Sequence, residues 1–279
     1  MKTFFRFIKH ILIFLFLTVI TQVGGLIYLL YQPVSRKIKQ RVKNKSKQRL
    51  VRLTAFTALY LLISWTIVPL AAKQFGRVPL PMFATTDAPI QPRHYFFLLA
   101  NRNYVKPELK ATIIKTAKAL DKKYPNAKVL YLDGCFPFVD GMPLMPHLSH
   151  SDGKKLDIAF VYKHKETGKY TNKTPTWVGY GGSEMPESNE ENRPEFCKKQ
   201  GYFQYSVLKR LTPIIGKSSL EFDDKANSWL VQYLAKQPAV GKIFIEPHLK
   251  TRFGLRNVNK IRFHGCQAVR HDDHIHVQL

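Results

Sequence analysis

Residues 270–279 read RHDDHIHVQL, and this stretch decides how the C-terminal part of the chain folds. Side chains of a β-strand alternate between its two faces, so His274 and His276 share one face. The apolar residues at 275, 277 and 279 share the other face and can pack on a core. The histidines of a His-x-His strand can also simply face solvent. The pattern therefore indicates a functional site only when a second histidine-rich pattern accompanies it.

A second histidine-rich stretch lies at residues 146–157, which read PHLSHSDGKKLD. Asp157 lies between Leu156 and Ile158 on a predicted strand, where its carboxylate needs a partner because burying an unpaired charge is costly. His150 lies seven residues earlier, across a turn that can fold it back beside Asp157. Together with His276, these residues offer three protein ligands and leave a fourth position open, which is the composition of a catalytic zinc site.

These two stretches carry a resemblance to a known group of enzymes. His-x₆-Asp followed far downstream by His-x-His resembles the zinc peptidases grouped with lysostaphin, the D-Ala-D-Ala peptidases and the hedgehog signalling domain. The context is most similar to the penicillin-insensitive murein endopeptidases. The resemblance covers roughly residues 128–279 and rests on HLSHSDGKKLD (147–157), KIFIEPHLK (242–250) and RHDDHIHVQL (270–279). The N-terminal apolar segments and residues 163–200 have no counterpart in that family.

The resemblance implies that His150, Asp157 and His276 hold Zn²⁺, and that His274 is an active-site histidine beside it. Imidazole titrates in the range that proton transfer needs, so His274 is the expected general base. His271 matches a further active-site histidine, which we expect to stabilise the developing oxyanion.

The residues around this group also carry expectations. His147 matches a further histidine near the metal in that family, and Asp272 or Asp273 can accept a hydrogen bond from one of the rings and orient it. We expect Glu246 to be a solvated strand end. The remaining histidines are assigned to the surface or to packing: His94, His164, His248 and His264.

Residues 1–72 predict a membrane anchor. They contain twelve Lys or Arg and no acidic residue. The uncharged runs at about 11–31 and 53–72 each have the ~20 residues that a transmembrane helix needs. A signal peptide is the alternative for the first run, but its apolar core is normally shorter. Nine basic residues between the runs place that loop in the cytoplasm by the positive-inside rule. The N-terminus and residues 73–279 would then face the periplasm or the outside of the inner membrane.

The charge of the C-terminal part indicates which kinds of partner it can bind, and the cysteine content limits the number of disulfides. Subtracting the twelve basic residues of the anchor from the total of +25 leaves +13 for residues 73–279. That charge suits an acidic polymer or an anionic membrane surface, and no nucleic-acid-binding motif is present, so we expect no nucleic acid partner. Three cysteines allow one disulfide at most, and a Cys135–Cys266 bridge is one possibility.

The remaining pattern predicts an α+β fold. Helices are expected at 107–124, 204–215 and 223–236, and strands at 128–133, 156–162, 242–246 and 274–279. These elements are interspersed without repeated βαβ units, which favours a small antiparallel sheet with flanking helices and a metal site. Residues 73–100 are rich in proline and predict a tether. Residues 101–279 would form the peptidase domain.

The expected function is therefore a membrane-anchored zinc metallopeptidase that hydrolyses peptide cross-links of peptidoglycan. Two alternatives stay open. One is a D,D-carboxypeptidase or dipeptidase that acts on D-Ala ends. The other is a non-catalytic, zinc-containing module that binds the cell wall.

Overall fold

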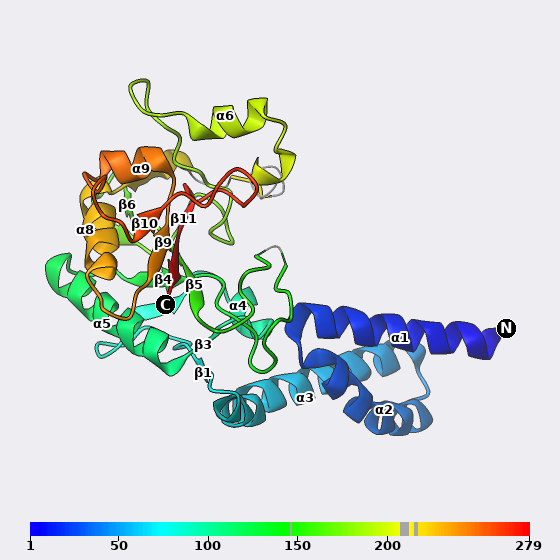
Figure 1. The fold of residues 1–279 in the computed structure, drawn as a ribbon. Helices are drawn as coiled ribbons and strands as arrows, with labels where there is room; N and C mark the ends of the chain where they lie inside the picture. Colours follow the sequence, from blue (N-terminus) through cyan, green and yellow to red (C-terminus); the bar gives the residue numbers. More distant parts are fainter. Residues whose placement is uncertain (146, 207–211, 215–216) are drawn as a thin grey trace.

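The structure, a computed structural model, describes the whole chain except residues 146, 207–211 and 215–216 (Figure 1). Three N-terminal helices form an elongated projection from a mixed α and β body. They are α1 (Lys2–Thr21), α2 (Gly24–Arg41) and α3 (Lys45–Gln74). The body contains small sheets and flanking helices, as the sequence predicts.

The chain reverses between α1 and α2, so residues 11–31 do not form the single span that we expected. Gln22, at the turn, has a left-handed backbone with φ of 63°. Gly25 follows it, and a Cβ there would lie 2.0 Å from the Thr18 hydroxyl oxygen. Only glycine lets the two helices approach so closely. An uncharged run long enough for one helix thus forms a tight antiparallel hairpin.

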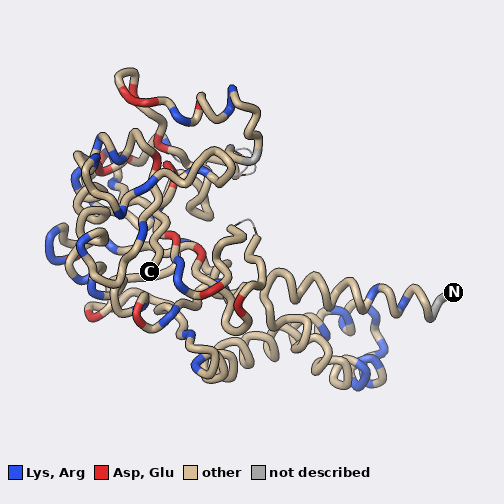
Figure 2. The backbone as a smooth tube through the Cα atoms, viewed as in Figure 1, with Lys and Arg blue, Asp and Glu red and all other residues tan. Residues whose placement is uncertain are grey.

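The basic residues of the anchor gather at the end of the projection that is far from the body (Figure 2). His10 of α1 lies 2.6 Å from the Tyr28 hydroxyl of α2, and the Tyr31 hydroxyl donates to the Arg52 carbonyl of α3. The start of α1 therefore lies beside the basic segment 34–52. A single span at 11–31 would have put it at the opposite end, beside the body.

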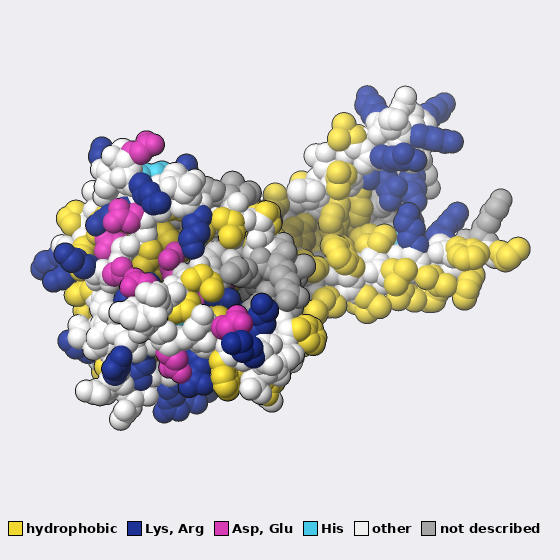
Figure 3. Space-filling view, turned by 90° about the horizontal axis from the view of Figure 1, so that it is seen from above, with side chains coloured by type: hydrophobic (Ala, Val, Ile, Leu, Met, Phe, Trp, Pro, Cys, Tyr) yellow, Lys and Arg dark blue, Asp and Glu magenta, His cyan; other side chains and the backbone are white. Residues whose placement is uncertain are grey.

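Two of these helices are long and apolar enough to cross a membrane. Their apolar stretches are Phe4–Thr21 in α1 and Lys45–Gln74 in α3, and few of these side chains are buried within the protein. Hydrophobic side chains cover the outside of the projection, and the basic cluster stands at its tip (Figure 3). Such an uncovered apolar surface is unusual for a protein surface in water.

A six-stranded sheet forms the centre of the body. Antiparallel pairing joins the four middle strands, and parallel pairing adds one strand at each edge. In spatial order the strands are β10 (Ile261–Arg262), β9 (Lys242–Phe244), β11 (His274–Gln278), β5 (Lys155–Ala159), β4 (Val129–Tyr131) and β2 (Ile90–Pro92).

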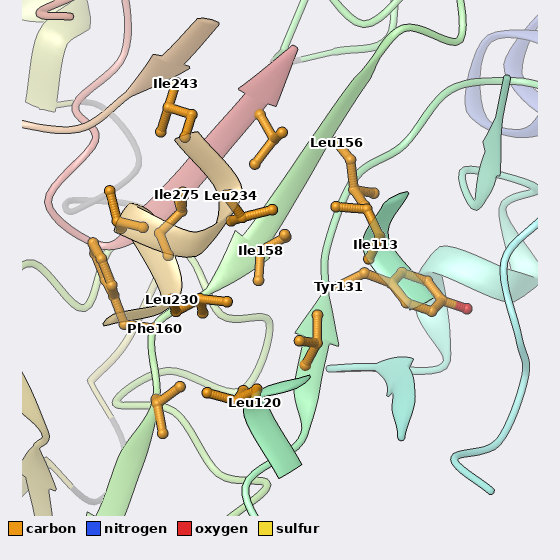
Figure 4. Close-up of a cluster of buried hydrophobic side chains, with 14 of the residues drawn as sticks. Ile113, Leu120, Tyr131, Leu156, Ile158, Phe160, Leu230, Leu234, Ile243 and Ile275 are labelled. Atoms are coloured by element: carbon orange, nitrogen blue, oxygen red, sulfur yellow. The ribbon is translucent and has the colours of Figure 1, made fainter. Parts of the chain in front are cut away.

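Two helices cover one face of this sheet and build the core with it (Figure 4). Helix α5 (Pro107–Lys123) begins at a proline, and α8 (Asp224–Ala235) begins where the Asp223 side chain accepts a hydrogen bond from the Ala226 N–H. Ile275 and Val277 of β11 are fully buried against these helices. The alternation expected from the sequence therefore turns His274 and His276 to the other face.

Residues 73–100 differ from the expected tether. Ile90–Pro92 is the edge strand of the main sheet, and β1 (Val78–Pro79) pairs with β3 (Tyr104–Val105). Helix α4 (Phe96–Leu99) lies between β2 and β3 in the sequence. Ile90 is fully buried, which explains the difference: its burial in the core outweighs the proline-rich composition around it.

The segment between β5 and β9 carries the second small sheet and short helices. Strand β6 (Tyr162–His164) lies between β7 (Tyr170–Thr171) and β8 (Leu220–Phe222). Half of the predicted helix at 204–215 falls outside the described residues. In the described part, Phe203–Ser206 is a 3₁₀ helix and Ile214 forms an isolated β-bridge with Thr176, so no α-helix is present there. The segment also contains the short helices α6 (Arg193–Lys199) and η2 (Lys217–Ser219). Helix α9 (Pro247–Arg252) follows β9.

One disulfide joins α6 to the segment before β11. It links Cys197 to Cys266, and Cys135 is a buried free thiol. A Cys135–Cys266 bridge was therefore the wrong pairing. The observed bond fixes the long 163–200 segment to residues that lie next to the second histidine-rich stretch.

Candidate metal centre

The pairing of β11 with β5 brings the first two predicted ligands together. His276 lies directly opposite Asp157 in this antiparallel pair, and His274 lies opposite Ala159. Residues opposite each other share one face of the sheet, so the imidazole and the carboxylate meet. His276 Nδ1 lies 2.8 Å from Asp157 Oδ1. Ala159 is small and leaves room for the His274 ring.

The third predicted ligand arrives across the turn before β5. Gly153, in that turn, has a left-handed backbone with φ of 73°. His150 Nδ1 donates to the Gly134 carbonyl at 2.8 Å, which fixes the tautomer and leaves Nε2 as the free donor atom. That Nε2 lies 3.3 Å from Asp157 Oδ1 and 3.1 Å from His276 Nδ1.

The spacing of these three atoms suits a small metal ion. Zinc ligands at ~2.0–2.1 Å around a tetrahedral centre lie about 3.3 Å from one another. The observed separations of 2.8, 3.1 and 3.3 Å lie close to that value. His150, Asp157 and His276 are all buried and can hold a metal ion. The sequence alone predicted this group.

A second group shares the same carboxylate. His147, Asp157 and His274 also lie close enough to hold an ion. His274 Nε2 is 3.6 Å from Asp157 Oδ1, and His147 Nδ1 is 3.3 Å from Asp157 Oδ2. Among the described residues, neither His274 Nε2 nor His147 Nε2 has a hydrogen-bond partner, although both are buried. Buried polar atoms without protein partners are typical of a site that binds an ion or a water molecule.

Asp273 orients His274, and Asp272 does not. His274 Nδ1 donates to Asp273 Oδ1 at 2.5 Å, and Asp273 Oδ2 accepts from the Gly181 N–H. Asp272 instead pairs with the neighbouring Arg270 guanidinium. The sequence left the choice between the two aspartates open, and the structure assigns the role to Asp273.

Two residues that the sequence did not single out hold the site together. The Tyr180 hydroxyl donates to Asp157 Oδ2 at 2.8 Å and accepts from the Asp133 N–H. Asp133 accepts two hydrogen bonds from Arg102, at 2.6 and 2.7 Å, and one from His147 at 3.0 Å. Asp133 ends a predicted strand, so the reasoning applied to Asp157 could have found it. Tyr180 lies in the 163–200 segment, where no pattern marked it.

His271 and His264 lie beside the ligand group. A cavity of about 310 Å³ is lined by both, together with His147, His150 and His276. The His271 ring centroid is 4.9 Å from that of His274 and 5.6 Å from that of His276. His264, which we expected at the surface or in packing, stacks on Phe244 and lines this cavity.

The structure also places the other residues that we expected at the surface or in packing. His248 is fully buried, and its Nε2 donates to the Glu184 carbonyl. His94 packs edge-on against Trp177. Glu246 is wholly buried and accepts a hydrogen bond from the His271 N–H, so the expected solvated strand end is wrong.

The charges of the site are set by burial and by the shared carboxylate. Burial favours a neutral Asp157, but the surrounding imidazoles His150, His274 and His147 hold its pKa well below the usual range. Burial lowers the pKa of His276 to about 4, so this imidazole stays neutral. Burial also opposes a charge on His274, but Asp157 and Asp273 raise its pKa to about 9. An ionised carboxylate beside a neutral imidazole is a suitable donor set for a divalent metal.

Comparison with known proteins adds no relative. No protein-family model matches the chain, and no curated protein matches it either. The metal centre is therefore defined by its geometry alone.

Proposed function

We propose that this chain is a membrane-anchored zinc metallopeptidase that hydrolyses peptide cross-links of peptidoglycan. The observation that supports it most is the convergence of His150, Asp157 and His276 at tetrahedral spacing. His274 stands beside that group with a buried, unpartnered nitrogen. Three protein ligands with a further imidazole at hand are typical of catalytic zinc sites.

His274 is suited to move the proton of the reaction. Asp273 holds its Nδ1, so Nε2 is the nitrogen that exchanges a proton. Against the effect of burial, Asp157 and Asp273 raise the pKa of His274 to about 9. A divalent cation held by Asp157 would offset the first of these charges and favour a neutral Nε2. The neutral ring would then take the proton from the attacking water and deliver it to the leaving amine. Asp273 keeps the ring in place and stabilises the imidazolium that forms between these steps. When bound, the zinc ion would supply Lewis-acid chemistry to the scissile amide.

His271 is suited to a second role at the same carbonyl. It lines the cavity beside the metal centre, and its ring lies next to that of His274. Burial lowers its pKa well below the usual value, so the ring stays neutral and can donate one hydrogen bond. We assign this hydrogen bond to the oxygen on which negative charge develops.

The substrate assignment rests on charge and location. The net charge of +13 on residues 73–279 favours an acidic polymer, and the apolar helices α1 and α3 favour a membrane anchor. The positive-inside rule places the basic cluster in the cytoplasm and hence the body on the opposite side, where the cell wall lies. Because α1 and α2 form a hairpin, the N-terminus would also be cytoplasmic, in contrast to the expectation from two spans.

The substrate class is tested by hydrolysis with the full chain in detergent. We expect zinc-dependent cleavage of cross-linked muropeptides, which a chelator abolishes and added zinc restores. Asp157→Ala should lose this activity, and Asp87→Ala, which removes a fully exposed carboxylate, should keep it. Cleavage of D-Ala-D-Ala peptides alone would favour the carboxypeptidase. Zinc bound without cleavage of any wall peptide would refute the proposal in favour of a binding module.

A further inference from the structure

A second cavity lies where α3 meets the body. It measures about 360 Å³ and shares no lining residue with the cavity beside the metal centre. Trp65 and Pro69 of α3 form one wall, and residues 79–82 with Leu98 form another. Lys110 of α5 also lines it, together with the buried amides of Asn101 and Asn103. The cavity thus combines an apolar wall with a polar, cationic part.

The apolar wall lies on the part of α3 where the anchor meets the body. The Tyr60 hydroxyl of α3 donates to the Leu99 carbonyl, so the body already contacts α3 before the helix reaches Trp65. Neighbouring side chains of α3 that point outward, such as Leu62 and Leu70, are exposed and apolar. With α3 in the bilayer, the Trp65–Pro69 wall therefore lies beside lipid at the outer end of the span.

The charges at the cavity favour an anion. Within the described part of the chain, Lys110 is the one charged side chain that lines it, and no acidic side chain does. Burial lowers the pKa of Lys110, and the nearby cation Lys73 lowers it further. Lys73 belongs to the last turn of α3, where the headgroups would lie. Two neighbouring ammonium groups, one of them half-buried, are a suitable site for a phosphate.

The surface around the cavity is also suited to the membrane interface. Phe83, which follows the lining residue Met82, packs against Tyr95 with ring centroids 6.4 Å apart. Both rings are largely exposed. Aromatic side chains of this kind are enriched where a protein meets the headgroup region.

We propose that this cavity binds one anionic phospholipid of the bilayer. An acyl chain would lie along Trp65 and Pro69, and the phosphate would face Lys110 and Lys73. The lipid would then fix the body against the membrane at the outer end of α3. This inference goes beyond hydrolysis and does not depend on the metal centre; it rests only on α3 lying in the bilayer.

The test titrates lipid onto the delipidated full chain in detergent and counts bound lipid by native mass spectrometry. We expect one phosphatidylglycerol per chain, bound at least about tenfold more tightly than phosphatidylcholine with the same acyl chains. Lys110→Glu should weaken the binding of phosphatidylglycerol at least about tenfold. Lys118→Glu is the matched control, because Lys118 lies on the same helix but does not line the cavity, and it should bind as the wild type does.

A second variant tests the apolar wall. Met82→Trp places a larger side chain in the cavity and should reduce the binding of both lipids. Equal affinity for the two lipids, or equal behaviour of Lys110→Glu and Lys118→Glu, would overturn the proposal. Displacement of the lipid by inorganic phosphate alone would instead assign the site to a free anion. Zinc content, measured on the same samples, reports on the metal centre independently, so failure of either proposal is distinguishable.

Discussion

His150 and His274 both face Asp157 through Nε2, and they differ in what holds Nδ1. His150 Nδ1 donates to the neutral carbonyl of Gly134, whereas His274 Nδ1 donates to the carboxylate of Asp273. The carbonyl fixes the tautomer and, against the effect of burial, raises the pKa of His150 less than Asp157 does. The Asp273 carboxylate favours the imidazolium, which is the form that a proton-transferring residue must visit. The two histidines are thus suited to different tasks around one shared carboxylate.

The largest expected effect separates proton transfer from metal binding. We expect His274→Ala to lower kcat by about 10²–10⁴-fold while the protein keeps its zinc, because proton transfer contributes in that range. Hydrolysis and zinc content measured on one preparation give both values. His94→Ala, at a histidine that packs on Trp177, is the matched control and should change neither. Full activity of His274→Ala would contradict the assigned role.

A smaller effect is expected from the partner of His274. Asp273→Asn keeps the shape of the side chain but removes the charge that stabilises the imidazolium. We expect kcat to fall about 10–100-fold, with the zinc affinity nearly unchanged. Steady-state kinetics beside a zinc competition titration would measure this. Loss of zinc in step with kcat would instead make Asp273 part of the support for the metal ligands.

The smallest effect concerns Glu246, a buried carboxyl group that lies outside the group of imidazoles around Asp157. Burial, with Asp272 nearby, raises the pKa of Glu246 to about 7. The folded protein therefore holds this proton more tightly than the unfolded chain does, and the stabilisation is lost as pH rises through about 7. Glu246→Gln should gain about 1–3 kcal/mol of unfolding free energy relative to the wild type between pH 5 and pH 8.

Chemical denaturation of the full chain in detergent at the two pH values measures that gain. The difference between wild type and variant cancels the titration of other groups. A difference that does not change with pH would contradict a protonated Glu246.

The metal site could be predicted because its signals are local. Alternation along residues 274–279 fixes which side chains share a face, and β5 carries Asp157 in a matching position. His150 needed only a turn to reach them. The same kind of reasoning misses Tyr180, because its contact with Asp157 depends on where a long irregular segment folds back. The pairing of Cys197 with Cys266 is missed for the same reason, because Cys197 lies in that irregular segment.

The fold of the membrane anchor, in contrast, could not be predicted from local signals. Residues 11–31 satisfy the length and composition of one span, and nothing in their charge marks the reversal. The hairpin depends on the close approach of Gly24 and Gly25 to α1, which is a tertiary contact. Residues 73–100 differ for a related reason, since Ile90 joins a sheet whose other strands come from distant parts of the chain.

The central claim is that His150, Asp157 and His276, rather than His147, Asp157 and His274, hold the metal. The most direct test is the zinc stoichiometry and affinity of the full chain beside His150→Ala and His147→Ala. We expect one zinc per chain in the wild type, at least about a 100-fold loss of affinity in His150→Ala, and retained zinc in His147→Ala. Retained zinc in His150→Ala with loss in His147→Ala would contradict the assignment, and no zinc in the folded wild type would refute the metal centre itself.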